Sequence, residues 1–175
     1  NRAGLVRPRL AFALGQPEQQ TMTYTRESGS NAPLTVTDAL GRQTAYTYDA
    51  KKNVTSVTRL AGTANSVTAS YTYEPAFNQI TSITDPLNHT TSFTYDSKGA
   101  LATITDPLNQ QTTLTTNAAG QPTSIQDPLT HTTQFGYDFG DLVTITDPLG
   151  SVTRRFVDGG GRLADDAELR RVLEH

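Results

Sequence analysis

The chain has 175 residues, of which 35% are hydrophobic, and a mean hydropathy of -0.46, so residues for a thick two-layer core are scarce. Charged residues make up 18% and the formal net charge is -3, which argues against a nucleic-acid partner because binding to a phosphate backbone requires a basic surface. The absence of cysteine excludes disulfides, thiolate zinc sites and cysteine nucleophiles, and no apolar run reaches the roughly 18 residues of a membrane span.

Residues 1–20 have no clear periodicity and are predicted to be irregular. The chain begins at Asn1, without a methionine or a signal-peptide pattern, so we expect it to be a fragment of a longer protein. A repeat array is predicted over residues 21–163. The tripeptide Asp-Pro-Leu recurs at spacings of 21, 21 and 20 residues, and an Asp-Ala-Leu variant precedes it; these turns begin at Asp85, Asp106, Asp127 and Asp147, and the variant at Asp38.

Each repeat of about 21 residues has two extended halves. In Thr91–Tyr95, Thr, Phe and Tyr alternate with Ser and Thr, which predicts a strand. A turn with an Asp or Asn acceptor and a Gly follows, as in Asp96–Gly99. The second strand, Leu101–Thr105, places Leu101 and Ile104 three apart, so either a bulge brings them to one face or both faces are partly covered. Length changes fall in the hairpin tips and in one insertion at residues 59–65.

Six units are readable, and residues 21–37 form a degenerate seventh. The predicted fold class is therefore all-β: tandem antiparallel β-hairpins, about fourteen strands in all, forming a curled meander or spiral sheet. After Leu163 the pattern stops, and residues 164–172 place acids before bases, which predicts a short C-terminal helix. The last three residues, 173–175, resemble the remnant of a purification tag.

Three units carry a family resemblance. DALGRQTAYTYDAKKNVTSVT, DPLNHTTSFTYDSKGALATIT and DPLGSVTRRFVDGGGRL resemble the Rhs or YD repeat, whose pattern is Asp-Pro-Leu-Gly-Arg-x-Thr, then Tyr-x-Tyr-Asp, then Gly-Arg-Leu. Thr116, Arg155 and Val157 depart from this pattern. The family's C-terminal segment, which carries the aspartate pair used for self-cleavage, has no counterpart in the sequence.

The resemblance implies a scaffold. Arrays of this family spiral into hollow β-shells that enclose a C-terminal toxin domain in bacterial polymorphic toxins and insecticidal toxin complexes, related shells occur in teneurins, and wall-associated members have been linked to carbohydrate binding. The implied location is secreted or on the bacterial cell surface. Six or seven units are too few to close a large shell, so the expected role is that of a wall segment.

The aromatic positions of the first strands are the candidate binding residues. An aromatic row could stack sugar rings, but the same row is the apolar face that a thin sheet must cover, and the second interpretation is favoured. The residues are Tyr46, Tyr48, Tyr71, Tyr73, Phe93, Tyr95, Phe135 and Tyr137.

Other polar patterns favour structure over chemistry. The repeated turn aspartates could form a calcium ladder, but each is expected to cap its own turn. His89 and His131 are separated by a unit with Gln110 in the equivalent position, so a metal pair is not expected. No Ser nucleophile elbow or phosphate-binding Gly loop is found. The sequence therefore predicts no catalytic residues, no metal site and no cofactor.

The favoured function is a non-enzymatic structural module of a larger toxin-type protein, and the alternative is a carbohydrate- or surface-binding adhesin module. The expected partners are the rest of the parent polypeptide or an encapsulated toxin domain, and a glycan under the alternative. Self-association through exposed sheet edges is also expected.

Overall fold

The computed structural model describes residues 21–155. Thirteen β-strands and no helix occur in this part of the chain; they are β1 (Thr23–Arg26), β2 (Pro33–Thr37), β3 (Gln43–Tyr48), β4 (Val54–Arg59), β5 (Val67–Tyr73), β6 (Ile80–Thr84), β7 (Thr90–Tyr95), β8 (Leu101–Thr105), β9 (Gln111–Thr116), β10 (Pro122–Gln126), β11 (Thr132–Asp138), β12 (Asp141–Thr146) and β13 (Val152–Arg154). The predicted irregular segment 1–20, the end of the last unit at 156–163, the helix at 164–172 and the tag remnant at 173–175 lie outside the described residues.

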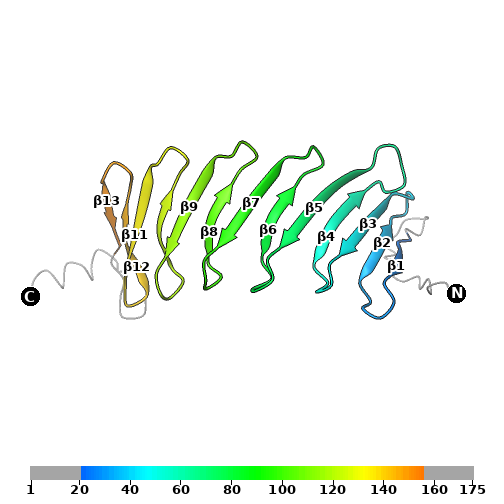
Figure 1. The fold of residues 1–175 in the computed structure, drawn as a ribbon, viewed down its shortest axis with the longest axis horizontal. Coiled ribbons are helices and arrows are strands. Elements are labelled where there is room, and N and C mark those ends of the chain that lie inside the picture. Colours follow the sequence, from blue (N-terminus) through cyan, green and yellow to red (C-terminus); the bar gives the residue numbers. More distant parts are fainter. Residues whose placement is uncertain (1–20, 156–175) are drawn as a thin grey trace, which may run out of the picture. The chain divides into compact units, whose positions relative to one another are not determined.

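The strands form one antiparallel meander. Their order in the sheet is their order in the chain, from β1 to β13, so every connection is a hairpin turn (Figure 1). The chain divides into two compact units, one ending at Ser92 and the other starting at Phe93. The predicted fold class, all-β with tandem antiparallel hairpins, is confirmed for the described residues.

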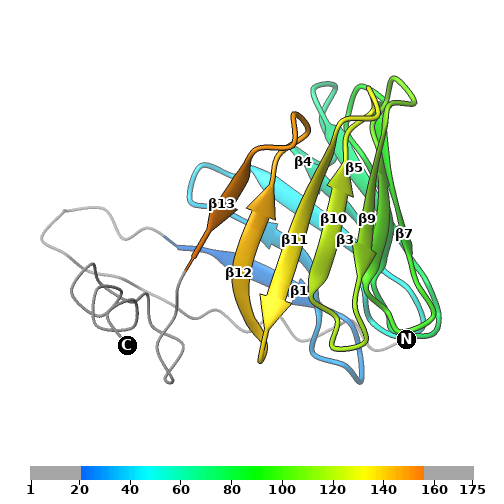
Figure 2. The same ribbon diagram turned by 90° about the vertical axis from the view of Figure 1, so that its left-hand side faces the viewer.

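Every strand except β13 has an aromatic or aliphatic face and a hydroxyl-rich face. In the second unit Phe135 pairs with Ile145, and Ile145 pairs with Thr153 across β11, β12 and β13, three strands that lie side by side in Figure 2. Cross-strand partners share a face and their neighbours in sequence take the other. We call the face that carries the aromatic positions the aromatic face, and the opposite one the hydroxyl face.

A β-bulge explains the three-residue spacing of apolar residues in the second strands. In β3–β4 the register shifts between Thr47 and Tyr48, so that Tyr46 pairs with Val57 and Tyr48 with Val54. The extra residue in β4 returns both valines to the aromatic face. The same shift occurs in β1–β2, β5–β6, β9–β10 and β11–β12. Of the two alternatives raised by the sequence, the bulge is the one that these hairpins adopt.

The Asp-Pro-Leu turns and the turns after the Tyr-Asp pairs share one geometry. In the first kind, Gly41 N–H donates to Asp38 O at 2.9 Å and Asp38 N–H donates to Arg42 O at 3.0 Å. In the second kind, Gly99 and Ala100 take the same places relative to Asp96. The fourth residue has a positive φ, from 62° to 84°, which explains why it is Gly or Asn in six of the eight turns. These are Gly41, Asn88, Gly99, Asn109, Gly120 and Gly150, and the other two are Lys52 and Thr130.

Hairpin tips absorb the predicted length changes. In the longer β5–β6 turn, Glu74 replaces Asp and its longer side chain accepts N–H groups from Ala76 and Phe77 at 2.7 and 2.6 Å. The shorter β11–β12 turn has only Phe139 and Gly140 in its loop, with φ of 46° and 95°. Two successive positive φ values define the tight hairpin turn that matches strand twist.

No residue in the described part of the chain is fully buried. The aromatic face is half-buried, since its Tyr, Val and Ile side chains cover one another along a single sheet. As in other repeat proteins, each hairpin is then stabilised mainly by its neighbours and not by a central core.

Candidate functional site

All eight candidate aromatic residues are half-buried in the structure. The first position of each pair lies beside the Val or Ile of the second strand, as Tyr71 does beside Ile83. The second position lies beside the residue that precedes the bulge, as Tyr73 does beside Ile80. The row therefore belongs to the apolar layer of the aromatic face.

The second tyrosine also connects one hairpin to the hairpin before it. Tyr48 Oη donates to the carbonyl of Pro33 at 2.7 Å, and Tyr73 Oη donates to the carbonyl of Val54 at 2.8 Å. Burial raises the pKa of both tyrosines above the ordinary value. These hydroxyls are therefore committed to backbone contacts. In β9, Thr116 replaces this tyrosine, and its Oγ1 instead donates to Asp96 Oδ2 at 3.3 Å.

The hydroxyl face carries a cluster of side-chain hydroxyl groups that recurs in most of the hairpins. Thr47 Oγ1 lies 2.8 Å from Thr55 Oγ1 and 2.7 Å from Ser56 Oγ. Cross-strand Thr pairs of this kind contribute roughly 0.2–1 kcal/mol each. The cluster recurs in Thr72/Thr81/Ser82, Thr115/Thr123/Ser124 and the pair Thr94/Thr103. In β11 the position is Gly136, where a Cβ would lie 2.2 Å from Thr144 Oγ1.

Turn aspartates cap their own turns, as predicted. Asp85 Oδ1 accepts N–H groups from Leu87 and His89 at 2.8 and 2.9 Å. The backbone N–H of His89 holds the pKa of Asp85 below its usual range. Asp38, Asp106, Asp127 and Asp147 bind their turns in the same way.

In three of these aspartates, Asp38, Asp85 and Asp127, the second carboxylate oxygen contacts the side chain four residues later. His89 Nδ1 lies 3.0 Å from Asp85 Oδ2, and His131 Nδ1 lies 2.9 Å from Asp127 Oδ2. Each histidine is therefore paired with the aspartate of its own turn. Within residues 21–155, three or more His, Cys, Asp or Glu side chains do not gather in the way that a metal ion requires.

The turns lie in two rows, one at each end of the strands, which we call the Tyr-Asp edge and the Asp-Pro-Leu edge. The two rows of turns carry different side chains. At the edge with the Tyr-Asp turns, neighbouring hairpins exchange polar contacts: Lys52 Nζ lies 2.6 Å from Glu27 Oε2, and the amides of Asn53 and Asn78 bond each other at 2.7 Å. At the Asp-Pro-Leu edge, the leucine of each turn is 73–92% exposed; these are Leu40, Leu87, Leu108, Leu129 and Leu149. One edge is thus joined by polar side chains while the other carries a row of apolar ones.

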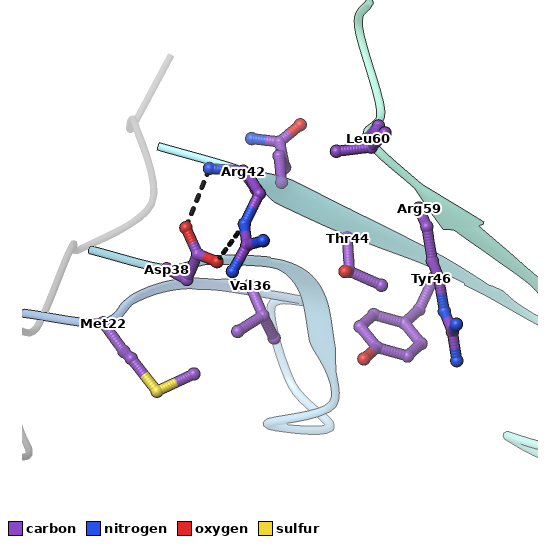
Figure 3. A pocket seen from close by; sticks show the side chains of 9 residues that line it. Met22, Val36, Asp38, Arg42, Thr44, Tyr46, Arg59 and Leu60 are labelled. Carbon is purple, nitrogen blue, oxygen red and sulfur yellow. Dashed lines mark hydrogen bonds and ion pairs between the residues drawn. The ribbon is translucent and has the colours of Figure 1, made fainter. Parts of the chain in front are cut away.

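The aromatic face of the first unit contains a hollow of about 450 Å³ (Figure 3). Tyr46 and Thr44 of β3 and Arg59 at the end of β4 line it, together with Asp38 and Arg42 of the neighbouring turn and Met22, Val36, Gln43 and Leu60. We call this cavity the Tyr46 hollow. Of the eight candidate aromatics, only Tyr46 lines it.

The sequence matches the model of a known protein family. The model of the Rhs repeat matches residues 28–64, 75–111 and 117–152, which together make up more than half of the chain. The chain belongs to the Rhs-repeat family. None of the described residues of this Rhs chain forms a helix able to cross a membrane.

Solved structures similar to this Rhs chain include assemblies of TcdB2 and TccC3. The crystal structure of TcdB2-TccC3-Cdc42 gives a TM-score of 0.46 at 17% identity, covering 82% of the Rhs chain and 10% of that chain. TcdB2-TccC3 without its hypervariable C-terminal region gives 0.46 at 18% identity, covering 85% and 10%. The Tc holotoxin pore of Photorhabdus luminescens gives 0.44 at 18%, covering 82% and 10%. The Rhs chain therefore spans about 10% of the length of these chains. No curated protein matches it.

Sequence reasoning did not identify two features of the Rhs array. The first is the row of exposed turn leucines, whose place in a turn motif does not by itself show that their side chains point into solvent. The second is the place of Arg59 in the Tyr46 hollow, because the insertion at residues 59–65 indicates only a change in length. Aligning the repeats position by position would have found Arg59 in the place of the turn aspartate.

Proposed function

We propose that this chain is a non-catalytic structural scaffold, a wall segment of an Rhs β-shell. The observation that supports this best is the use of the repeated residues. Tyr48 and Tyr73 bind the preceding hairpin through their hydroxyls, the turn aspartates bind their own turns, and the bulge threonines bind across strands. The residues that define the repeat are thus occupied in building the sheet.

Membership of the Rhs family supports the wider role. Family arrays form shells around other domains, so the proposed partners are the rest of the parent polypeptide and an enclosed toxin domain. The parent would be a larger secreted or cell-surface protein of the toxin type. The proposed array covers residues 21–163, between an N-terminal segment and a C-terminal tail.

An in-phase deletion tests the scaffold. Removing Asp106–Gln126 takes out one turn with β9 and β10 and joins Thr105 to Asp127, which restores an Asp-Pro-Leu turn at the junction. The shortened chain should remain folded by circular dichroism, with a smaller urea m-value because less surface is exposed on unfolding.

A matched out-of-phase deletion provides the control. Removing Asp106–Thr116 takes out one turn and one strand, so β10 must reverse its direction to pair antiparallel with β8 through the turn at Asn117–Gly120. This variant should be much less stable than the in-phase deletion, because it places two second strands side by side and breaks the alternation on which the contacts between hairpins depend. If the in-phase deletion also unfolds the chain, the modular scaffold is wrong.

A second candidate function is binding of a glycan or surface through the aromatic row. The observation that favours it is the Tyr46 hollow, because the cavity places an aromatic ring beside polar side chains. The aromatic-row hypothesis covers Tyr46, Tyr48, Tyr71, Tyr73, Phe93, Tyr95, Phe135 and Tyr137. Glycan-array binding that is lost in both Tyr46→Leu and Tyr71→Leu, with melting temperatures preserved, would support this function for the row as a whole.

A further inference from the structure

Arg59 replaces a recurring residue of the repeat with one of opposite charge. Two residues after the Val or Ile of each second strand, the chain places an aspartate in five units, at Asp38, Asp85, Asp106, Asp127 and Asp147. After Val57 the same position is Arg59. Among the units of residues 21–155, only the unit of Val57 has a basic residue and not an aspartate at this position.

The exchange changes the charge beside one aromatic residue. Arg59 pairs with Thr44, and Tyr46 pairs with Val57, so both side chains lie on the aromatic face of the same hairpin. Figure 3 shows Tyr46 and Arg59 side by side in the Tyr46 hollow. In the next hairpin, Asp85 takes the place of Arg59, and a carboxylate would repel an anion near Tyr71.

The charges of the hollow do not cancel. Its lining contains one carboxylate and two guanidinium groups, from Asp38, Arg42 and Arg59. Arg42 Nε lies 2.7 Å from Asp38 Oδ2, so these two form an ion pair. Within residues 21–155, the guanidinium of Arg59 has no hydrogen-bond or ion-pair partner. The hollow is therefore locally positive in a chain of net charge -3.

We propose that the Tyr46 hollow binds an acidic saccharide, with the carboxylate of a sugar-acid residue on Arg59 and the sugar ring against Tyr46. The planar guanidinium is suited to bidentate binding of a carboxylate. Thr44, which pairs with Arg59 on the same face, supplies a hydroxyl group for the ring hydroxyls of the sugar. This site goes beyond the scaffold role, and it narrows the surface-binding alternative to one cavity and one ligand charge.

Calorimetry on the full chain with trigalacturonic acid as the probe tests the site, and neutral galactotriose is the matched sugar. The acid should bind, and galactotriose should bind at least about tenfold more weakly, because it cannot form the charge-assisted contact. Arg59→Gln should weaken binding of the acid by at least about tenfold. Arg59→Asp, which restores the residue of the other units, should abolish it.

Two control variants show whether binding depends on this cavity or on any cation and any aromatic ring of the sheet. Arg154→Gln removes a cation from the hydroxyl face of the other unit, where Arg154 pairs with Thr144, and it should leave binding unchanged. Tyr71→Leu removes the equivalent aromatic ring of the hairpin in which Asp85 takes the place of Arg59, and it should also leave binding unchanged. Melting temperatures of all variants are measured to show that the fold is retained.

Several results would overturn the proposal. Equal binding of galactotriose and trigalacturonic acid would remove the role of the charge, and loss of binding in Tyr71→Leu but not in Arg59→Gln would return the function to the aromatic row as a whole. Displacement of the sugar acid by tetraglutamate at equal concentration would indicate an acidic peptide as the ligand. Absence of binding at millimolar trigalacturonic acid would leave the scaffold role intact and exclude this site.

Discussion

Tyr73 Oη donates a hydrogen bond to the carbonyl of Val54, 2.8 Å away, and so ties one hairpin to the preceding one. Tyr48 makes the same contact with Pro33 one unit earlier. Val54 is the residue that pairs with Tyr48 just before the bulge. The second tyrosine of the repeat therefore binds where the ladder of the neighbouring hairpin is locally interrupted, which gives this position a structural reason to be a tyrosine and not a phenylalanine.

Tyr73→Phe should lower the free energy of unfolding by about 1 kcal/mol, since it removes the hydroxyl and leaves the Val54 carbonyl without this donor. Tyr71→Phe is the matched control, because in the described part of the chain the Tyr71 hydroxyl has no such partner, and its effect should be within about 0.5 kcal/mol. Urea denaturation measures both. Equal losses in the two variants would contradict the role of the Tyr73 hydroxyl.

Asn117→Ala should destabilise the β9–β10 turn by about 1 kcal/mol, a value typical for the loss of a side-chain cap. Asn117 Oδ1 accepts N–H groups from Ala119 and Gln121 at 2.9 and 3.0 Å. Asn117→Asp should retain the stability at neutral pH, because a carboxylate oxygen takes this place in the equivalent turn of Asp96. Thermal unfolding compares the two variants, and a similar loss in both would show that the Oδ1 acceptor of Asn117 does not account for its contribution to stability.

Stability should fall as the solution is acidified below about pH 4. The backbone N–H groups of Arg42, His89 and Ala100 lower the pKa values of Asp38, Asp85 and Asp96 in the fold. A carboxyl whose folded pKa is lowered stabilises the protein fully above the unfolded value, and this contribution is lost as the pH falls through the folded value.

Asp85→Asn tests this pH dependence, because an amide oxygen can accept the same N–H groups without titrating. The acid limb of the melting temperature against pH should become flatter in this variant than in the parent chain. Asp138→Asn is a control for the removal of one negative charge near a different turn. Parallel acid limbs in all three proteins would show that turn capping by Asp85 does not drive acid unfolding.

Gly136→Thr should raise the free energy of unfolding by about 0.5–1 kcal/mol, because glycine in a strand is costly. Thr144 Oγ1 would have to rotate away, since it lies 2.2 Å from the position of a new Cβ, but Thr144 Cβ lies 3.6 Å away and need not move. The Thr94 and Thr103 pair, with Oγ1 atoms 2.7 Å apart, shows the arrangement that the new pair should reach. A lower stability than the parent in urea denaturation would show that Thr144 cannot adjust.

The Asp-Pro-Leu edge should drive self-association and contribute little to folding. Leu108, Leu129 and Leu149 are 76%, 73% and 92% exposed, so replacing all three with Ser should leave the melting temperature nearly unchanged. Sedimentation of the parent chain should show concentration-dependent association that this triple variant reduces. If the two proteins sediment alike, the apolar edge is not the contact surface, and pairing through the terminal strands remains as the expected route.

The sequence predicted the fold because each signal was local. A meander follows from three local features together: the period of two in the first strands, the Asp and Gly of the turns, and the repeat length. The observed strand order agrees, since consecutive strands are neighbours throughout the sheet. The bulge could be anticipated only as one of two alternatives, because the three-residue spacing of Leu101 and Ile104 also fits a regular strand with both faces partly covered. The sequence also does not show that the two kinds of turn share one geometry, since Pro and Leu in one kind are replaced by residues such as Ser and Lys in the other.

The candidate site was less accessible to sequence reasoning. The aromatic positions were identified by their spacing, but their hydroxyl partners are backbone carbonyls one hairpin away, and any residue type has a carbonyl. Tyr46 and Tyr48 therefore looked equivalent in sequence, whereas in the structure Tyr48 binds Pro33 and Tyr46 lines a cavity. The distinction depends on how neighbouring hairpins are placed, which a repeat pattern alone does not contain.

The irregular turns have a consequence for folding. In a perfectly regular array, any hairpin could pair with any other, because every unit would offer the same strand and the same turn geometry. The longer turn at Glu74, the two-residue loop at Phe139 and the insertion after Arg59 distinguish the units from one another. These differences favour the pairing of each hairpin with its correct neighbour over pairing with other units. A version idealised to the consensus repeat would gain local stability but would be more prone to pairing between the wrong hairpins.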